Sequence, residues 1–513
     1  MAKRLMIQGT MSGAGKSLLC AALCRIFKQD GLRVAPFKSQ NMSLNSYVTA
    51  DGLEIGRAQA VQAQAAGIAP DARMNPVLLK PSSDTGSQVI VNGTARGHMG
   101  AVDYFHYRKS LIPEILAAFD SLAAEYDVII IEGAGSPAEI NLRENDIVNM
   151  GLAELTDAPV ILVGDIDRGG VFAQLYGTVA LLTPPERARV RGLVINKFRG
   201  DLEILRPGLA ELETLTGIPV LGVVPYLQAD IDDEDSLSPT LSRDMTGATL
   251  SRDTSGATLS RDASGATLSR DTSGAALDIA VIRFPRLSNF TDFAPLGVRY
   301  VERASRLGAP DMVILPGTKS TVSDLLWARQ NGLESAILKL AARGTPILGI
   351  CGGYQMLGEQ IDDPSGAESA LPGLRGMGLL PCRTVFEASK TLRRAKGVAT
   401  GGPFDGAALD GYEIHMGVTD ARGPAFCVLD GARPDGCRRG NVMGTYLHGL
   451  FDSGEAVDKL RAWLYARKGV APGDTKPESR EQYRERQYDL LAEGVRGALD
   501  MDALRRILLF QST

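Results

Sequence analysis

Short apolar runs alternate with segments of helical periodicity over residues 1–230, and this alternation restricts the fold more than any other feature of the chain. Strands that alternate with helices in this way form a parallel sheet, so the pattern predicts an α/β fold in which helices cover such a sheet. The predicted strands are Leu5–Gln8, Val34–Phe37, Val128–Glu132, Val160–Gly164, Gly192–Asn196 and Val220–Val224. We expect ligands to bind where these strands end.

The first predicted strand runs into a glycine-rich turn, Gly9-Thr-Met-Ser-Gly-Ala-Gly-Lys16-Ser17, and then into a helical pattern. This order is typical of a P-loop, although the strict motif has a glycine where this chain has Thr10. The alternative is a plain glycine-rich turn. The expected roles are wrapping of phosphates by Gly13 and Gly15, neutralisation of phosphate charge by Lys16, and binding of Mg²⁺ by Ser17.

Two further strand ends carry side chains suited to phosphoryl chemistry. The second predicted strand ends in Pro36-Phe-Lys38-Ser-Gln-Asn-Met-Ser-Leu-Asn45-Ser, which is dense in amides and hydroxyls. Lys38 is predicted to stabilise charge on a transferring phosphoryl group, the alternative being a solvated loop lysine. Glu132 ends an apolar strand and is predicted to bind Mg²⁺ directly or through water, the alternative being an exposed acid at a strand end.

Charge and cysteine content exclude several classes of protein. Lys and Arg number 55 against 60 Asp and Glu, a net charge of −5, so no basic field favours nucleic acid or an anionic membrane. The six cysteines form no CxxC pair, which argues against a zinc site or a disulfide framework. The N-terminus lacks the apolar core of a signal peptide, and no long apolar run predicts a membrane span. We expect a cytoplasmic protein.

A nine-residue unit, Thr-Leu-Ser-Arg-Asp-x-Ser/Thr-Gly-Ala, occurs four times in succession over residues 240–275. It has one leucine per unit and is rich in polar residues, so it is predicted to be a low-complexity linker. A small stack of repeats is the competing interpretation, but it would bury too little surface. The predicted organisation is a first domain over 1–232, a linker over 233–277, a second domain over 278–460 and a charged helical tail over 461–513.

The second half has predicted strands at Asp278–Arg283 and Asp311–Leu315, and then the apolar run Ile347-Leu-Gly-Ile ends at Cys351-Gly-Gly. A strand, a tight turn and a helix at this point would raise the thiol out of the fold and direct backbone N–H groups at it. The alternative is an ordinary buried cysteine. His448 ends a later apolar run and is one of only four histidines, so it is the predicted base for Cys351. His415 is the rival.

A nucleotide site and a thiol–imidazole pair in one chain suggest coupled chemistry. ATP would phosphorylate a carboxylate, while the thiol would release ammonia from an amide donor such as glutamine through a thioester. Ammonia would then attack the acyl phosphate.

Longer motifs connect the chain with a known family. Leu315-Pro-Gly-Thr-Lys-Ser, Gly349-Ile-Cys351-Gly-Gly-Tyr-Gln and Tyr446-Leu-His448-Gly resemble those of cobyrinate-type class I glutamine amidotransferase domains. The first half resembles the dethiobiotin synthetase-like ATPase domain. Two of its stretches are similar to those of the cobyric acid synthase family in particular, Pro36-Phe-Lys-Ser-Gln-Asn-Met-Ser-Leu-Asn-Ser and Glu132-Gly-Ala-Gly-Ser-Pro-Ala-Glu-Ile-Asn-Leu. The resemblance covers nearly all of the chain apart from the repeats.

The resemblance implies a glutamine- and ATP-dependent ligase. The expected reaction is amidation of the b, d, e and g carboxylates of adenosylcobyrinic acid a,c-diamide to give adenosylcobyric acid in cobalamin biosynthesis, with ATP and Mg²⁺ as cofactors and glutamine and a corrinoid as substrates. The alternatives are a cobyrinic acid a,c-diamide synthase, a regulatory P-loop ATPase with a non-catalytic thiol domain, and a thiol hydrolase with an ATP-gated lid. The oligomeric state is left open.

By matching position, the resemblance also implies roles for single residues. At the thiol site, the nucleophile is Cys351, the base is His448, and the oxyanion hole is formed by Gly317 and Gly352. At the nucleotide site, ATP and Mg²⁺ are bound by Lys16, Ser17, Lys38 and Glu132. The residues near the substrate carboxylates are Gln40, Asn41 and Asn45. Many relatives have a glutamate two residues after the histidine, where this chain has Leu450. A third member is therefore missing or comes from elsewhere in the chain, Glu413 being one guess, and we expect a Cys/His dyad.

Overall fold

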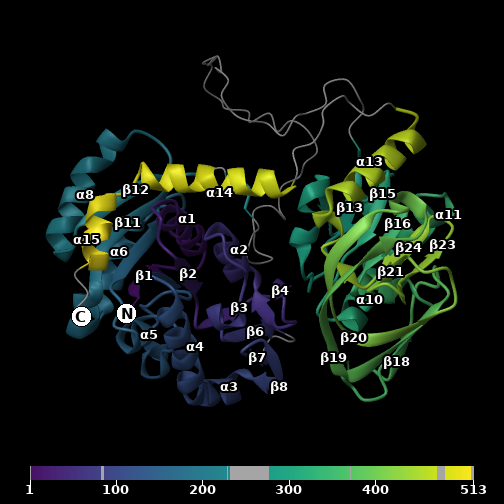
Figure 1. Cartoon of the computed structure of the whole chain (residues 1–513), viewed down its shortest axis with the longest axis horizontal. Helices are drawn as coiled ribbons and strands as arrows, with labels where there is room; N and C mark the ends of the chain where they lie inside the picture. The colour runs from purple at the N-terminus through teal and green to yellow at the C-terminus, as the bar shows by residue number, and fades with distance from the viewer. Residues whose placement is uncertain are drawn as a thin grey trace. The chain divides into compact units, whose positions relative to one another are not determined.

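The structure, a computed structural model, describes residues 2–81, 86–227, 229–231, 277–369, 371–470 and 480–509 (Figure 1). The chain divides into two compact units. Met1–Asp235, Leu392–Arg394 and Glu481–Thr513 form the first, and Ser236–Thr391 and Ala395–Arg480 form the second. Residues 232–276, with the nine-residue repeats and nearly all of the predicted linker, lie outside the described residues. The predicted domain boundaries stay predictions.

The first unit is built on a six-stranded parallel sheet with the strand order β12-β11-β10-β1-β9-β2. Its strands are β1 (Lys3–Gly9), β2 (Val34–Phe37), β9 (Val128–Glu132), β10 (Val160–Asp165), β11 (Val190–Phe198) and β12 (Val220–Pro225). All six predicted strands are thus confirmed. Successive side chains alternate between the two faces, so Leu5 and Ile7 enter one core cluster and Met6 the other.

Helices cover both faces of this sheet (Figure 1). One core cluster takes its helical side chains mainly from α1 (Lys16–Gln29), α14 (Arg480–Arg496) and α15 (Met501–Leu509). The opposite cluster draws chiefly on α4 (Ile112–Glu125), α5 (Met150–Leu155), α6 (Val171–Leu181) and α8 (Leu202–Thr216). Among the described residues of this unit, the remaining helical segments are α2 (Arg57–Ala65), α3 (Ala101–Tyr107), α7 (Pro184–Arg189), η1 (Ala72–Met74), η2 (Arg108–Leu111) and η3 (Ile140–Asn145).

Between β2 and β9 the chain forms a separate four-stranded sheet that the sequence did not predict. Its strands, in the order β3-β6-β7-β8, are β3 (Gln40–Met42), β6 (Val77–Pro81), β7 (Gly86–Val91) and β8 (Thr94–Gly100). A short antiparallel pair, β4 (Ser46–Val48) and β5 (Glu54–Gly56), lies within the same segment. The amide-rich stretch after Lys38 therefore belongs to a small sheet of its own through β3, a three-residue polar strand whose periodic signal is too weak to be predicted.

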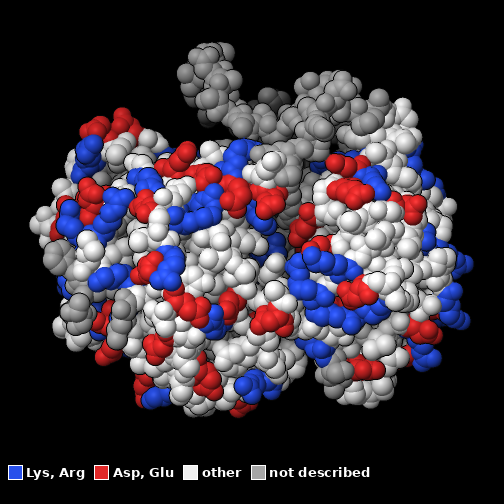
Figure 2. All heavy atoms as spheres, in the orientation of Figure 1, with Lys and Arg blue, Asp and Glu red and all other residues white. Residues whose placement is uncertain are grey.

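The C-terminal helices pack on the first unit, a placement that the sequence did not predict. Tyr488 and Val495 of α14 and Leu504 of α15 are buried in the core cluster that contains α1. Arg25 of α1 is ion-paired with both Glu485 and Asp489 of α14 (Nη1···Oε2 2.8 Å and Nε···Oδ1 2.7 Å). The charged residues of the tail form one face of these helices, and the few apolar residues form the other. Figure 2 shows basic and acidic side chains interspersed over the visible face of this unit.

The second unit contains a six-stranded sheet with the order β14-β13-β15-β16-β24-β23, in which only β23 is antiparallel. Its strands are β13 (Ile279–Ile282), β14 (Arg299–Val301), β15 (Met312–Leu315), β16 (Ile347–Ile350), β23 (Cys437–Arg439) and β24 (Val442–Thr445). The helical segments are α10 (Thr321–Gln330), α11 (Leu333–Ala342), α12 (Gly352–Leu357), α13 (Gly454–Lys468), η4 (Phe290–Leu296), η5 (Ala304–Arg306), η6 (Gly402–Phe404) and η7 (Leu450–Asp452).

A second, largely antiparallel sheet completes this unit. It contains β17 (Gln360–Asp362), β18 (Gly373–Arg375), β19 (Cys382–Ala399), β20 (Ala408–Ala421), β21 (Cys427–Leu429), β22 (Arg433–Asp435) and β25 (Leu447–His448). Its register pairs Tyr412 of β20 with His448 of β25. The two sheets share one hydrophobic core, so a histidine from the second sheet is placed beside the strand end of the first. Within the described residues, no helix has both the length and the apolar character that crossing a membrane requires.

Candidate active sites

The predicted elbow is present in the second unit. Cys351 joins β16 to α12 with φ 52° and ψ −111°, a backbone conformation that non-glycine residues rarely adopt. The turn is possible because its neighbours have no side chain: a Cβ on Gly353 would lie 2.0 Å from the main-chain oxygen of Leu315. Such strain at the start of a helix holds the sulfur in a fixed position next to main-chain N–H groups.

His448 lies beside the thiol, as predicted. Its ring is near enough to Cys351 for the thiol to affect the imidazole pKa, stacks on Tyr412 at 5.2 Å between ring centroids, and is 1% exposed. Burial lowers the pKa of this imidazole, but hydrogen bonds and charge interactions with Asp292 and Cys351 outweigh burial and raise the pKa from 6.5 to about 10. At neutral pH His448 therefore carries a proton that it can give to a leaving amide nitrogen.

The third member of the site is Asp292, which corrects both the predicted dyad and the choice of Glu413. Nδ1 of His448 lies 2.8 Å from Oδ2 of Asp292, and the aspartate is buried in η4. Glu413 instead accepts hydrogen bonds from Arg433 at 3.0 and 2.6 Å. Asp292 lies 156 residues before His448, so no motif spacing links the two. The one available signal was an acid set between Phe290 and Phe293.

Gly317 and Gly352, the predicted oxyanion residues, both adjoin the reactive pair. A Cβ on Gly317 would lie 3.0 Å from Cε1 of His448, and one on Gly352 would lie 2.8 Å from Cγ2 of Thr318. The loop after Gly317 is held by Asp324, whose carboxylate accepts hydrogen bonds from the hydroxyl of Thr318 and the main-chain N–H of Arg286. Burial raises the pKa of Asp324 to about 6. The oxyanion roles stay predictions.

The P-loop of the first unit is braced by the end of β11. Gly15 has φ 98°, and a Cβ there would lie 2.1 Å from Nδ2 of Asn196, so only glycine fits. Asn196 Nδ2 donates to the main-chain oxygen of Ala14 at 2.9 Å, and Lys197 Nζ donates to that of Gly13 at 2.6 Å. Lys16 Nζ donates to the main-chain oxygens of Met11 and Gly135 at 3.1 and 3.0 Å. Loop and lysine are thus held at a helix N-terminus, where phosphates bind.

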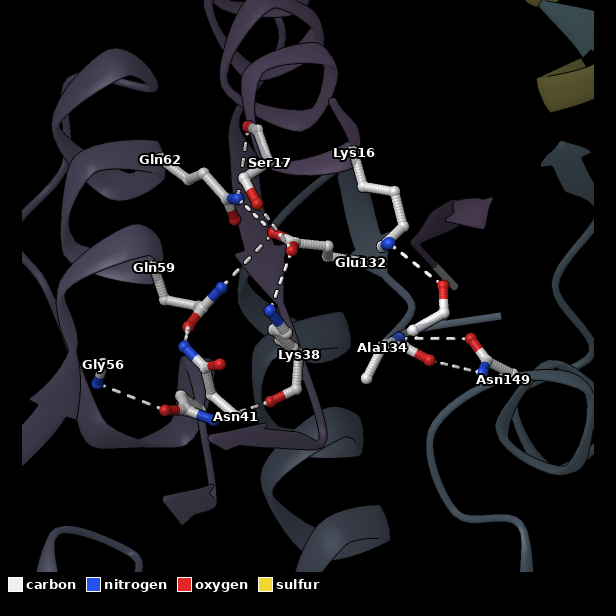
Figure 3. Close-up of polar contacts among 12 residues, drawn as sticks. Lys16, Ser17, Lys38, Asn41, Gly56, Gln59, Gln62, Glu132, Ala134 and Asn149 are labelled. Carbon is white, nitrogen blue, oxygen red and sulfur yellow. Dashed lines mark hydrogen bonds and ion pairs between the residues drawn. The ribbon is translucent and has the colours of Figure 1, made fainter. Parts of the chain in front are cut away.

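Glu132 is the centre of the second predicted cluster, and Figure 3 shows the surrounding side chains pointing toward it. Its Oε1 accepts hydrogen bonds from Ser17 Oγ and Lys38 Nζ, both at 2.8 Å. Its Oε2 accepts from Gln62 Nε2 at 2.5 Å and from Gln59 Nε2 at 3.4 Å. The structure brings the three predicted residues together. The two glutamines of α2 were missed, although their spacing places them on one helix face.

The predicted substrate residues do not form one group. Strand alternation sends Gln40 and Asn41 of β3 to opposite sides. Asn41 Nδ2 donates to Gln59 Oε1 at 3.1 Å and so joins the Glu132 cluster (Figure 3), whereas Gln40 Oε1 accepts from the hydroxyl of Tyr104 in α3 at 2.6 Å. Asn45 is buried, and its main-chain oxygen accepts from the N–H of Arg57 at 3.2 Å.

Comparison with known proteins agrees with this division into two kinds of site. Residues 5–239 match the model of the CobQ/CobB/MinD/ParA nucleotide binding domain, and residues 278–456 match that of the CobB/CobQ-like glutamine amidotransferase domain. A cobyric acid synthase from Ruminiclostridium cellulolyticum is 51% identical over 528 aligned residues, covering 99% of this chain and 97% of that protein. The chain belongs to the cobyric acid synthase family.

Other members of the cobyric acid synthase family match equally completely. That from Lachnoclostridium phytofermentans is 49% identical and that from Streptococcus sanguinis 48%, each alignment covering 99% of both chains. The family resemblance inferred from the motifs is therefore confirmed, as is the fold class of a P-loop domain with a parallel sheet joined to a glutamine amidotransferase domain.

Proposed function

We propose that this protein converts adenosylcobyrinic acid a,c-diamide to adenosylcobyric acid by amidating the b, d, e and g carboxylates, with glutamine as nitrogen donor and ATP as energy source. Nearly full-length membership of the cobyric acid synthase family carries this proposal. The two sites supply the chemistry it needs, because one can release ammonia and the other can activate a carboxylate. The reduced cysteines fit a cytoplasmic enzyme.

In the second unit, the sulfur of Cys351 attacks the side-chain amide carbon of glutamine. Main-chain N–H groups near Gly317 and Gly352 stabilise the resulting oxyanion. His448 then gives its proton to the departing nitrogen, which leaves as ammonia, and a thioester remains. Water attacks the thioester with His448 as general base, so that glutamate and the free thiol are produced. Asp292 orients the imidazole throughout.

In the first unit, the P-loop holds the phosphates of ATP and Lys16 neutralises part of their charge. A carboxylate oxygen of the corrinoid attacks the γ-phosphorus, ADP leaves, and Lys38 stabilises the transferring group. Ammonia then attacks the acyl carbon and phosphate leaves. Ser17 and Glu132 are oxygen ligands of the kind that Mg²⁺ prefers, and their oxygens lie 2.8 Å apart, so they would hold this ion. When bound, it neutralises phosphate charge.

The direct test is turnover of the purified protein with the a,c-diamide, ATP, Mg²⁺ and glutamine carrying heavy nitrogen in its side-chain amide. Mass spectrometry is expected to find four labelled amides on the corrinoid. Two labelled amides on cobyrinic acid would indicate the a,c-diamide synthase instead. ATP hydrolysis that ignores glutamine, with no labelled corrinoid, would indicate a regulatory ATPase.

Asp292→Asn is expected to lower glutamine hydrolysis by roughly 10²–10⁴-fold, because an amide orients the imidazole poorly and cannot stabilise its charge. The alkaline limb of the pH profile should also move to lower pH, since the variant lacks the carboxylate that raises the pKa of His448 to about 10. Initial rates of glutamate release across pH measure both effects.

The same pair contributes to stability in a defined pH range. Because the folded-state pKa of His448 lies above its ordinary value of 6.5, the stabilisation is complete below pH 6.5 and is lost as pH rises to about 10. The stability difference between wild type and Asp292→Asn should therefore shrink over this range.

Glu413→Gln is the matched control for the pH profile of glutamine hydrolysis, because it removes a buried acid that pairs with Arg433. A shifted pH limb in the control alone would contradict the assignment of Asp292.

A further inference from the structure

Two glutamines of α2 converge on the carboxylate of Glu132. Gln59 and Gln62 are 0% and 1% exposed, and both side chains point at Glu132 in Figure 3. Their amide nitrogens bond the same oxygen, Oε2, at 3.4 and 2.5 Å. Glutamine is mostly exposed in proteins, and burying its amide costs free energy unless the amide is hydrogen-bonded. The pair therefore needs a role that the phosphate-binding loop does not explain.

The two carboxylate oxygens of Glu132 have different kinds of hydrogen-bond donor. Oε2 is held by amides that are themselves fixed: Gln59 Oε1 accepts from Asn41 Nδ2 at 3.1 Å, and Gln62 Nε2 also lies 3.4 Å from the main-chain oxygen of Ser17. Oε1 is instead held by Ser17 Oγ and Lys38 Nζ, two long-reaching or rotatable groups. A carboxylate has about four acceptor positions, so these four donors occupy all of them. A cation can reach the carboxylate only where a donor withdraws.

The donors that can withdraw are those that bond Oε1. The hydroxyl of Ser17 can rotate and offer its own oxygen to the cation, and Lys38 can turn to a bound phosphate. Neutral amides have no charge that a cation would repel, so they can stay on Oε2 while the cation binds. The amide pair thus keeps the carboxylate from rotating when its other two partners leave.

A second observation points to a ligand at the same place. Oε1 of Gln62 is a buried acceptor for which the described residues provide no hydrogen-bond partner. The orientation of this amide is well determined, because its nitrogen faces the two acceptors Glu132 Oε2 and Ser17 O. A buried acceptor without a protein partner is normally bonded by water, and Mg²⁺ usually keeps several waters.

We propose that Gln59 and Gln62 are positioning residues for the divalent cation: they clamp Oε2 of Glu132 so that Oε1 is presented to the ion, and Gln62 accepts a hydrogen bond from a water of the ion. The proposal rests on the function proposed above, in which Ser17 and Glu132 hold Mg²⁺. In this proposal two neutral amides orient the carboxylate that binds the cation, which accounts for the burial of both glutamines.

The test is Mn²⁺ binding to the full chain with a non-hydrolysable ATP analogue, followed by electron paramagnetic resonance. Gln62→Leu is expected to weaken Mn²⁺ binding by roughly 10–100-fold, the usual effect of losing a group that orients a metal ligand. Binding of the analogue without metal should be unchanged. Gln59→Leu should have a smaller effect, because its hydrogen bond to Glu132 is longer.

Gln64→Leu is the matched control, since Gln64 is on the same helix but accepts a hydrogen bond from Tyr488 at 3.2 Å instead of contacting Glu132. Wild-type Mn²⁺ affinity in Gln62→Leu would overturn the proposal, as would equal loss of metal-free analogue binding. If Gln62→Leu does not fold, Gln62→Asn, which retains the amide but shortens its reach, should show the same metal-specific weakening, and normal affinity there would also overturn it. Absence of Mn²⁺ binding in the wild type would instead reject the Mg²⁺ site of the proposed function.

Discussion

Cys351→Ala is expected to abolish amidation driven by glutamine and to leave amidation driven by ammonium salts at wild-type rates. The thiol is the only group proposed to attack the glutamine amide, so its loss should reduce glutamate release by at least roughly 10³-fold. The ATP site in the other unit keeps Glu132, Lys38 and the P-loop and can use ammonia from solution. Amide formation on the corrinoid, measured with each nitrogen source, checks both halves of this expectation.

Cys437→Ala is the control for this experiment. Cys437 is also buried in the second unit, but it lies on β23, the edge strand of the sheet. The control should retain both reactions. Glutamine-driven amidation that persists in Cys351→Ala would contradict the assignment of the nucleophile, and loss of the ammonia-driven reaction would show that the substitution disturbs the ATPase unit.

Lys38→Met should produce the opposite pattern, with amidation lost for both nitrogen sources and glutamine hydrolysis retained. The ammonium group of Lys38 is buried against Glu132, and we assign it to the charge of the transferring phosphoryl group. Removing one preorganised charge partner of a transition state lowers rates by roughly 10²–10³-fold. ADP formation that depends on the corrinoid, measured beside glutamate release, separates the two activities.

Lys80→Met distinguishes chemistry from stability, because Lys80 forms a second buried ion pair in the same unit, with Glu54 at 2.7 Å. The exposed fractions of the two pairs are the same, 6% for each lysine and 1% for each glutamate. Both variants leave a buried carboxylate without its partner and should lower the melting temperature. Only Lys38→Met should abolish ADP formation per folded molecule, and equal activity in the two variants would remove Lys38 from the mechanism.

Local patterns accounted for the framework of this protein. Apolar runs of three residues in β1 and four in β9 identified these strands, because strand and helix periodicities are properties of neighbouring residues. The P-loop and the elbow could also be predicted from the sequence, since each consists of consecutive residues whose backbone conformation needs glycine. Cys351 and His448, the proposed nucleophile and base, could therefore each be singled out as residues at strand ends.

The partners of these residues were decided only by the tertiary structure. Asp292 reaches His448 from η4, Gln59 and Gln62 reach Glu132 from α2, and α14 returns to cover the first sheet. Glu413 is closer to His448 in sequence than Asp292 is, yet it is ion-paired with Arg433. A contact between distant parts of the chain leaves no periodic trace, because it depends on how whole elements pack. The sequence alone thus determined which residues can react, and the packing of distant elements decided which groups orient them and set their charge.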